Sequence, residues 1–497
     1  MKNYILPILF VALYFSANAQ TTFFKKFPAD MHYFPTDVST LSDGNILCCY
    51  KTQPYFLGNY TIHVCILNGY GETLYTWSQE NTPEINIRFM QAMEFNDKIY
   101  LIGMGNSSQN NVTLPIITTN IFDYQLQEEN SNFIKIIHPF VDRVGDVRVK
   151  SKKDCLALSG DCIEEQGRMN PFYMEISVQG DELCFYLDRT LTPWVYNFDF
   201  ELKPDYYGIT TFHMNWYYYD RLPWASICNY DTGFNLVSEF ELPEYFFSNY
   251  SSLKIDEGTY YFAGNIYDTV IVQTTHLGII KVTDKGEVLN EFYSYNINDS
   301  CTNVAVFNSI DLLKTGNVIL CSSINCDNLT GLQQYPSFIR LTKLTPDLDL
   351  ISECYIGVGE QAQYVAYVMR TTPEGGILVA GCYSDTPPNN TTKKQMIIFQ
   401  TDGNGLFTGI GDNPTNITST EAILYPNPAS EMINIEFSQV YQKANFQLMD
   451  IGGKIVFEKQ LGSNYQSINI STLPAGTYVY RIFNKEGLDE RGKIVVE

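Results

Sequence analysis

Two short sequence motifs alternate along most of the chain and limit the folds that it can adopt. The first is a polar turn followed by an apolar strand that ends in a small residue, as in Glu374–Gly381 (EGGILVAG). The second is an apolar strand, a polar turn and another strand, as around Asp402–Gly405 (DGNG). Short apolar runs bounded by Gly, Asn and Asp are typical of antiparallel strands joined by tight turns. Each pair of motifs therefore predicts one meander of about four strands.

The pairs of motifs recur every 40 residues or more, roughly, which is typical of a β-propeller. One meander cannot bury both of its faces, and a ring of neighbours supplies the cover. The sequence predicts an all-β fold, a seven-bladed β-propeller, with six or eight blades as alternatives and two stacked β-sandwiches as the competing arrangement. The second meander has only a degenerate second motif, and the fourth lacks a clear first motif. The seven meanders lie near residues 35–78, 89–130, 145–188, 205–241, 250–294, 307–356 and 366–409.

The last part of the chain, residues 421–497, differs from this repeat. Seven short apolar runs fit into it, and Met432–Phe437 (MINIEF) alternates apolar and polar residues as a half-buried strand does. Strands at this close spacing predict a small β-sandwich after the propeller. Residues 410–420 are polar and interrupted by Gly and Pro, so they are interpreted as a linker.

This C-terminal segment resembles the type A C-terminal sorting domain of the Bacteroidetes type IX secretion system, also called the Por secretion system. The resemblance implies an Ig-like sandwich that the outer-membrane translocon recognises and usually cleaves while the cargo is attached to surface lipopolysaccharide. An ordinary Ig-like accessory domain is the alternative. The residues that carry the resemblance are Tyr425, Pro426, Asn427 and Pro428 at its start, Asp450, Gly452, Gly453 and Lys454 in a turn, Gly476 and Tyr478 in a turn and strand, and Lys493 and Val495 near its end.

The first residues have the pattern of a secretory signal peptide, residues 1–19. Lys2 is followed by an apolar run from Tyr4 to Phe15 and by the small residues of Ala17-x-Ala19. Cleavage is expected between Ala19 and Gln20, and the run is too short to span a bilayer as a helix. The repeat domain is then expected to occupy residues 20–409. Export to the outside of the cell is consistent with both ends of the chain.

The chain is strongly acidic although few of its residues are charged. The formal net charge is −23 with 18% charged residues. Residues 421–497 hold seven Lys or Arg and nine Asp or Glu, a balance of only −2, so the repeat domain carries the acidity. Such a surface repels nucleic acid, which is therefore not expected as a partner.

Cysteine and histidine give no metal site. Twelve Cys are present, several inside apolar runs, so mostly free and buried thiols are expected, with Cys155–Cys162 and Cys321–Cys326 as two candidate disulfides. The five His, His63 among them, lack partners at metal-ligand spacing. No cofactor is predicted; Ca²⁺ at Asp347–Asp349 or Asp402–Gly405 is a weaker alternative to an ordinary β-turn.

Aromatic residues concentrate between Phe185 and Tyr250, where three of the four Trp occur. Aromatic side chains with polar tips suit sugar and peptide ligands, and packing between blades is the alternative use. Trp216, Tyr218 and Trp224 are the candidate ligand-binding residues. No Gly-x-Ser-x-Gly motif or other catalytic motif occurs, and no catalytic residue is assigned. The sequence favours a secreted or surface protein that binds an unknown glycan or protein; the alternative is a secreted hydrolase or lyase acting on polymers.

Overall fold

The computed structural model is all-β. Among the residues that it describes there is no helix, and none therefore that is long and apolar enough to cross a membrane. It describes residues 22–496 apart from 29, 55–59, 83, 110–111, 139, 165–166, 190–194, 203–207, 216–223, 243–245, 257, 268–274, 295–301, 327–332, 358–362, 385–393, 408–415, 419–421, 426–428, 430, 438–443, 451–453, 463–464 and 485–488.

Seven antiparallel sheets follow one another in the described part of residues 23–418. Sheet 1 is β2 (His32–Thr40), β3 (Ile46–Gln53), β4 (Thr61–Leu67) and β5 (Thr73–Glu80); sheet 2 is β6 (Ile85–Phe95), β7 (Lys98–Gln109), β8 (Val112–Phe122) and β9 (Glu128–Lys135); sheet 3 is β10 (Arg143–Lys152), β11 (Cys155–Ile163), β12 (Met169–Ser177) and β13 (Glu182–Leu187); sheet 4 is β14 (Val195–Leu202), β15 (Gly208–Asn215), β16 (Trp224–Asp231) and β17 (Leu236–Glu241).

Sheet 5 repeats this simple order, and sheets 6 and 7 depart from it. Sheet 5 is β18 (Phe246–Asp256), β19 (Thr259–Tyr267), β20 (Thr275–Thr283) and β21 (Val288–Ser294); sheet 6 is β22 (Thr302–Val304) and β23 (Ile310–Leu312), which both pair with β24 (Val318–Cys326), then β25 (Gln333–Leu344), β26 (Leu350–Ile356) and β30 (Asn416–Thr418); sheet 7 is β27 (Gln363–Thr371), β28 (Ile377–Ser384), β29 (Gln395–Thr401) and β1 (Phe23–Lys26).

The two sequence motifs mark the turns of these sheets. The first motif joins the first and second strands, as where Leu41 N donates to Asn45 O and Gly44 takes a φ of 86°. The second joins the third and fourth strands, and even its degenerate form forms a turn, with Leu126 at φ 57°. Sheet 4 has its four strands although the turn between β14 and β15 lies outside the described residues. The first five predicted meanders are therefore confirmed as four-stranded sheets.

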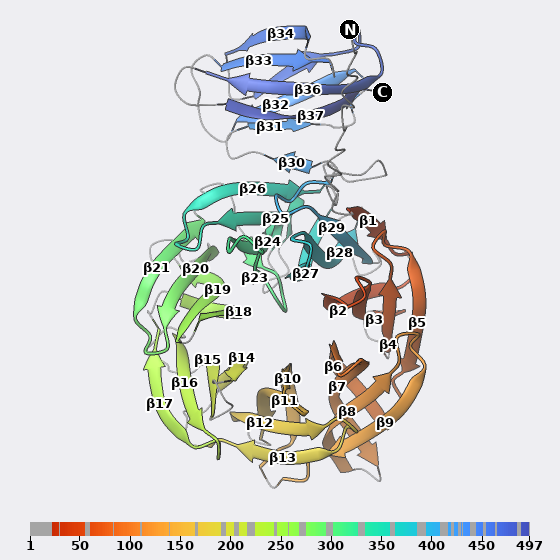
Figure 1. Cartoon of the computed structure of the whole chain (residues 1–497), viewed down its shortest axis with the longest axis vertical. Helices are drawn as coiled ribbons and strands as arrows, with labels where there is room; N and C mark the ends of the chain where they lie inside the picture. Colours follow the sequence, from red (N-terminus) through yellow and green to blue (C-terminus); the bar gives the residue numbers. More distant parts are fainter. Residues whose placement is uncertain are drawn as a thin grey trace, which may run out of the picture.

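The sheets are arranged in a ring (Figure 1). The first strand of each sheet contacts the first strand of the next, from β2 to β6, β10, β14, β18, β23 and β27, and β27 contacts β2. A separate apolar core fills each interface between neighbours, such as that of Ile117 with Leu158 between sheets 2 and 3. The core between sheets 7 and 1 contains Leu378 and Cys48. The arrangement is propeller-like.

Sheet 7 differs from the prediction in its fourth strand. The sequence motif at Asp402–Gly405 predicts a strand directly after it, but Leu406 and Phe407 are not in a strand, and β1 pairs antiparallel with β29 instead. Phe23 of β1 packs so closely on Gly71 of sheet 1 that a Cβ added to Gly71 would lie 2.4 Å from the phenyl group of Phe23. Lys25 Nζ also donates to Gly71 O at 2.8 Å. The first strand of the chain thus completes the sheet formed by residues 363–401.

Polar contacts join the first strands around the ring, and we call them the polar belt. Each contact runs from one sheet to the next, and the last returns from sheet 7 to sheet 1. The belt consists of Asp37 with the N–H of Ala92, Gln91 Oε1 with Val149 N (3.0 Å), Lys150 Nζ with Glu201 Oε1 (2.6 Å), Asp199 Oδ2 with Ser252 Oγ (2.6 Å), Ser251 Oγ with Ser309 N (2.7 Å), Asp311 Oδ2 with Thr371 N (2.7 Å), and Arg370 Nη2 with Asp37 Oδ1 (3.7 Å).

Residues 422–496 form two further sheets around one core that contains Ile433, Phe446 and Ile494, as predicted for a small β-sandwich. One sheet is β31 (Ala422–Tyr425), β32 (Met432–Phe437) and β35 (Tyr465–Asn469); the other is β34 (Ile455–Leu461), β33 (Ala444–Met449), β36 (Gly476–Phe483) and β37 (Asp489–Val496). Within the stretch interpreted as a linker, β30 pairs with β26 at the outer edge of sheet 6.

Candidate functional site

The side chains of the three predicted ligand-binding aromatic residues lie outside the described part of the structure. Trp216 and Tyr218 lie outside the described residues. The backbone of Trp224 begins β16, opposite Asn215 of β15, and its side chain is outside the described part. Their role in binding therefore stays a prediction.

Both candidate disulfides are wrong. Cys155 and Cys162 are free thiols of the single strand β11, and Cys321 is a free, buried thiol of β24, the strand that also holds Cys326. Each pair is separated by five or more residues of extended chain, about 16 Å or more, whereas a disulfide needs Cα atoms within about 7 Å. The ten cysteines whose side chains are described are all free, as expected for most of the set, and nine of them are buried.

The other polar candidates serve the fold locally. His63 stacks on Tyr50 with ring centroids 4.7 Å apart and hydrogen-bonds Thr52, and burial lowers its pKa to about 4. Asp402 Oδ1 accepts hydrogen bonds from the N–H groups of Asn404 and Leu406 within its own turn, both at 2.8 Å. In the described residues no group of three His, Cys, Asp or Glu side chains is arranged to hold a metal ion.

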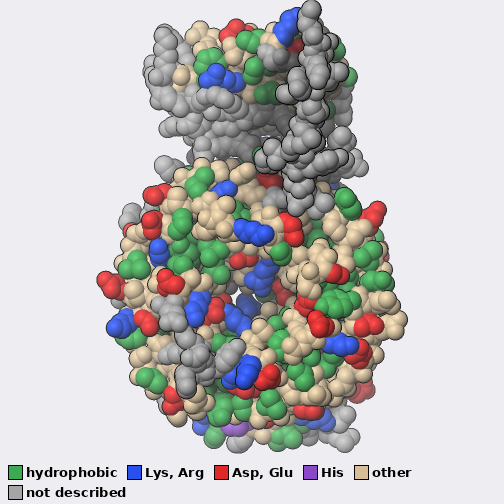
Figure 2. All heavy atoms as spheres, viewed as in Figure 1, with side chains coloured by type: hydrophobic (Ala, Val, Ile, Leu, Met, Phe, Trp, Pro, Cys, Tyr) green, Lys and Arg blue, Asp and Glu red, His purple; other side chains and the backbone are tan. Residues whose placement is uncertain are grey.

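Charged side chains gather instead at the centre of the ring, where Figure 2 shows Lys and Arg atoms in the opening. Two cations, Arg148 and Lys150, come from β10, and Arg370 comes from β27. Arg148 Nη2 donates to Phe307 O at 3.3 Å, a contact from sheet 3 to sheet 6 across the ring. We call this group, with Asp37, Asp199 and Glu201, the axial cluster.

Most of the carboxylates of the axial cluster are held by partners. Lys150 pairs with Glu201 and with Asp199 Oδ1 at 3.6 Å; burial alone would lower its pKa, but the two carboxylates outweigh burial and the pKa is raised. Asp199 also accepts from Ser252 Oγ. Burial raises the pKa of Asp37 although Arg370 and Arg148 oppose the shift, and only 5% of Asp37 is exposed. These carboxylates connect the sheets and have little access to a ligand.

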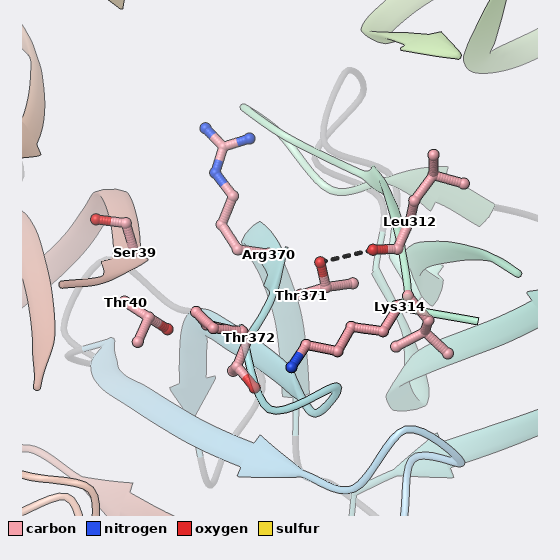
Figure 3. Close-up of a pocket in the computed structure, with 9 residues that line it drawn as sticks. Ser39, Thr40, Leu312, Lys314, Arg370, Thr371 and Thr372 are labelled. Atoms are coloured by element: carbon pink, nitrogen blue, oxygen red, sulfur yellow. Dashed lines mark hydrogen bonds between the residues drawn. The ribbon is translucent and has the colours of Figure 1, made fainter. Parts of the chain in front are cut away.

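A depression of about 410 Å³ opens beside the axial cluster, between the ends of the first strands of sheets 1, 6 and 7. We call it the axial pocket. In Figure 3 Arg370 projects from β27 and Lys314 projects from the turn after β23, toward Thr372. The residues that line the axial pocket are Ser39, Thr40, Leu312, Leu313, Lys314, Arg370, Thr371, Thr372 and Pro373.

Sequence reasoning missed this pocket. The signal that would have found it is a charged residue in the buried first strand of a meander, Arg370 after Val368 and Met369, directly before a polar turn. Lys314 lies in the polar turn that follows the first strand of the sixth meander. Arg370 and Lys314 could be assigned to the same end of the ring only once the direction of the first strands was known.

The predicted sorting residues lie in the C-terminal sandwich. Lys454 N donates to Asp450 Oδ1 at 3.0 Å in the turn between β33 and β34, whose Gly452 and Gly453 are outside the described residues, as are Pro426, Asn427 and Pro428. The hydroxyl of Tyr478 donates to Pro474 O at 2.7 Å. Gly476 begins β36, where Thr477 faces Val495 and Val479 faces Lys493 of β37. Tyr425 ends β31.

Comparison with known families settles the nature of this sandwich. Residues 423–497 match the family described as the secretion system C-terminal sorting domain. This segment is a type IX secretion C-terminal sorting domain. The sorting domain implies interaction with the type IX secretion machinery and directs the protein to the cell surface or to secretion. It accounts for the destination of the chain and not for the activity of the ring of sheets.

Solved structures resemble the chain only loosely. The α-L-arabinofuranosidase Arb93A of Fusarium graminearum shares 10% identity over 76% of this chain and 97% of its own, with a TM-score of 0.37. The polysaccharide lyase Uly1 shares 10% identity over 76% and 99%, at 0.46, and Drosophila Semaphorin 2a shares 8% over 95% and 97%, at 0.47. No curated protein matches the chain. At TM-scores below 0.5 these likenesses carry no argument about its function.

Proposed function

We propose that the protein is an exported binding or adhesion protein whose residues 20–409 form a closed seven-bladed β-propeller. The seven sheets, the core at each of the seven interfaces and the pairing of β1 with β29 support a closed ring. In this proposal residues 1–19 are the signal peptide, residues 410–420 the linker, and residues 421–497 the address that brings the propeller to the surface.

The chemistry of the axial pocket carries the choice of binding over catalysis. Among the described residues, its lining side chains are hydroxyl, aliphatic and cationic; the carboxylate of Asp311, which lies against Thr371, is held by the N–H and hydroxyl of that residue. Hydrolysis or elimination needs a positioned acid or base within hydrogen-bond reach of the substrate. Arg and Lys with hydroxyl groups instead hold a ligand by charge-assisted hydrogen bonds. The pocket suits recognition.

A hydrolase or lyase on the same scaffold remains the alternative. One observation favours it, since burial raises the pKa of Asp37, and a raised pKa is a common property of a general acid. Against it, Asp37 is 5% exposed and accepts hydrogen bonds from the N–H groups of Val38 and of Ala92 in the next sheet. A substrate at the axial pocket would not reach this group without a movement of the first strands.

Once at the surface, the protein is proposed to lose the sorting domain after about Thr420 and to be attached to lipopolysaccharide or released. Pairing of β30 with β26 keeps residues 416–418 on sheet 6 up to that point.

Full-length purified protein on glycan and matrix-protein arrays, beside hydrolysis assays with the same polymers, tests the proposal. Saturable binding of one ligand class without product release is the expected result. Product release with that polymer would replace the binding proposal by the enzyme alternative. Absence of binding to both arrays would overturn the binding proposal.

A further inference from the structure

The axial pocket is lined by positive charge although the protein as a whole is acidic. The chain as a whole carries a net charge of −23. Two cations nevertheless line this pocket, and no acidic side chain is among its lining residues. Two cations at one concave site of an acidic protein favour an anionic ligand, because the carboxylate beside Arg370, Asp37, is only 5% exposed and stands against one of the two charges.

Arg370 is positioned but not saturated. Its contact to a carboxylate among the described residues is the 3.7 Å approach of Nη2 to Asp37 Oδ1, too long for a hydrogen bond, and 34% of its side chain is exposed. The guanidinium has five N–H donors in a fixed fork. Asp37 therefore orients one side of the fork from below, and the remaining donors are available to a ligand. A bidentate pair with a carboxylate or a sulfate is the contact that this geometry favours.

Lys314 supplies the second charge from another sheet. It is exposed in the turn between β23 and β24, and no described residue forms a hydrogen bond or an ion pair with it. Neither burial nor a partner among the described residues holds its ammonium group. An ammonium on a flexible stem can follow an anionic group that Arg370 has already oriented.

The remaining lining groups point to a sugar. Ser39, Thr40, Thr371 and Thr372 line the pocket, and hydroxyl groups both donate and accept, as sugar ligands require. The Thr371 hydroxyl already donates to Leu312 O and Asp311 Oδ2, and Thr372 Oγ1 accepts from Gly376 N, whereas the buried Thr40 Oγ1 has no partner among the described residues. Ser39 and Thr40 are therefore the hydroxyl groups with most capacity left for a ligand. A volume of about 410 Å³ lies in the range of small-ligand sites, about 300–1,000 Å³. A folded protein partner would need a surface of about 800 Å² per side. The site is therefore sized for one short segment of a ligand.

We propose that the axial pocket binds a short saccharide that carries a carboxylate or a sulfate group, with Arg370 on the anionic group and Lys314 beside it. The inference rests on the proposed function, since it names the ligand class of the proposed binding domain. The acidic remainder of the chain repels long polyanions at distances up to a Debye length of about 8 Å, so a saccharide with few charges binds better than a long, densely charged chain.

Calorimetric titration of the full-length protein with matched saccharides tests this. The probes are oligogalacturonate and its methyl ester, a sulfated galactan oligosaccharide and its desulfated form, and a Glu-rich peptide of equal charge. We expect one acidic saccharide to bind at least tenfold more tightly than its neutral partner, since a charge-assisted hydrogen bond contributes roughly a tenfold factor or more. The carboxylate and sulfate arms decide which group is bound.

Substitutions connect the affinity to the pocket. Arg370→Gln should weaken binding of the acidic saccharide roughly tenfold or more, and Lys314→Ala about two- to fivefold, as for an exposed ion pair. Arg370 also contacts Asp37, so Arg370→Gln is compared with wild type by thermal unfolding; Lys314→Glu touches no packed group and should weaken binding roughly tenfold. Lys285→Ala, an exposed lysine in the turn between β20 and β21, is the matched control and should bind as wild type.

Each outcome separates the two proposals. Acidic and neutral saccharides bound equally, a peptide bound as tightly as the acidic saccharide, or binding unaffected by both Lys314→Glu and Arg370→Gln would overturn the anionic-sugar assignment and leave a binding protein. Absence of binding to every probe and to both arrays would overturn the binding function itself.

Discussion

Replacing Phe23 by Ala tests whether the first strand closes the ring. Phe23 is 7% exposed and belongs to the core between sheets 7 and 1, where it lies against Gly71. Its strand is held by four residue pairs with β29. Loss of the phenyl group of Phe23 leaves a cavity at the place where the two ends of the repeat domain meet.

The expected loss of stability follows from the burial. Phe→Ala changes in cores cost about 3–5 kcal/mol, and a site next to a chain end relaxes enough to place Phe23 near the lower value, about 3 kcal/mol. For a domain of about 390 residues the unfolding entropy is about 0.8 kcal/mol/K, so the melting temperature should fall by about 4 °C.

Thermal unfolding of the purified full-length protein, followed by circular dichroism, measures this shift. Tyr70→Ala is the control, because Tyr70 is an aromatic residue of the neighbouring turn but is 72% exposed. It should unfold within about 1 °C of wild type. A Phe23→Ala protein that also unfolds within that margin would refute the closure of the ring by β1.

Three further predictions follow from other parts of the molecule. Deleting Lys493–Glu497 removes the buried Ile494 and Val496 from β37, so the protein should stay folded in the periplasm instead of reaching the surface; fractionation decides this, and surface delivery at the normal level would contradict it. Burial lowers the pKa of His63 to about 4 from an unfolded value near 6.5, so the unfolded state binds more protons in this window and stability rises from pH 4 to 6.5; denaturant titrations of His63→Gln should show a flatter rise, and an unchanged slope would count against the assignment. Thiol counting of denatured, unreduced protein should find at least the ten free cysteines of the described part, and a count near zero would contradict the structure.

The repeat could be predicted because each of its turns is determined by residues that are close together in the sequence. A Gly at positive φ and a polar side chain that binds the turn N–H groups occur together in several of the turns, as at Gly375 and Thr372, so the number and order of the meanders follow from the sequence. The fourth strand of sheet 7 could not be predicted this way. Phe23–Lys26 pairs with residues about 370 positions later, and no local pattern carries that information.

The axial pocket escaped prediction for a related reason. Ser39, Leu312 and Arg370 are far apart in sequence and meet only because three first strands end at the same side of the ring. Abundance of aromatic residues drew attention to Trp216 and Tyr218 instead, since composition is visible in a sequence and convergence is not. The two disulfides failed because spacing along the chain was considered without the extended conformation of the strand between the cysteines.

The polar belt has a consequence for how such a chain can evolve. Four of its seven contacts end on a backbone N–H, which any sheet can offer, but three join particular side chains of consecutive sheets: Lys150 with Glu201, Asp199 with Ser252, and Arg370 with Asp37. If sheet 4 were deleted, Lys150 would lose both of its carboxylates, and if sheet 7 were duplicated, the Arg370 of the first copy would be separated from Asp37. Gain or loss of a whole repeat, the usual route by which repeat proteins change size, would therefore leave charges unpaired at the centre. The number of repeats in this lineage is expected to be fixed, and new ligands to arise by exchange of side chains at the ends of the first strands.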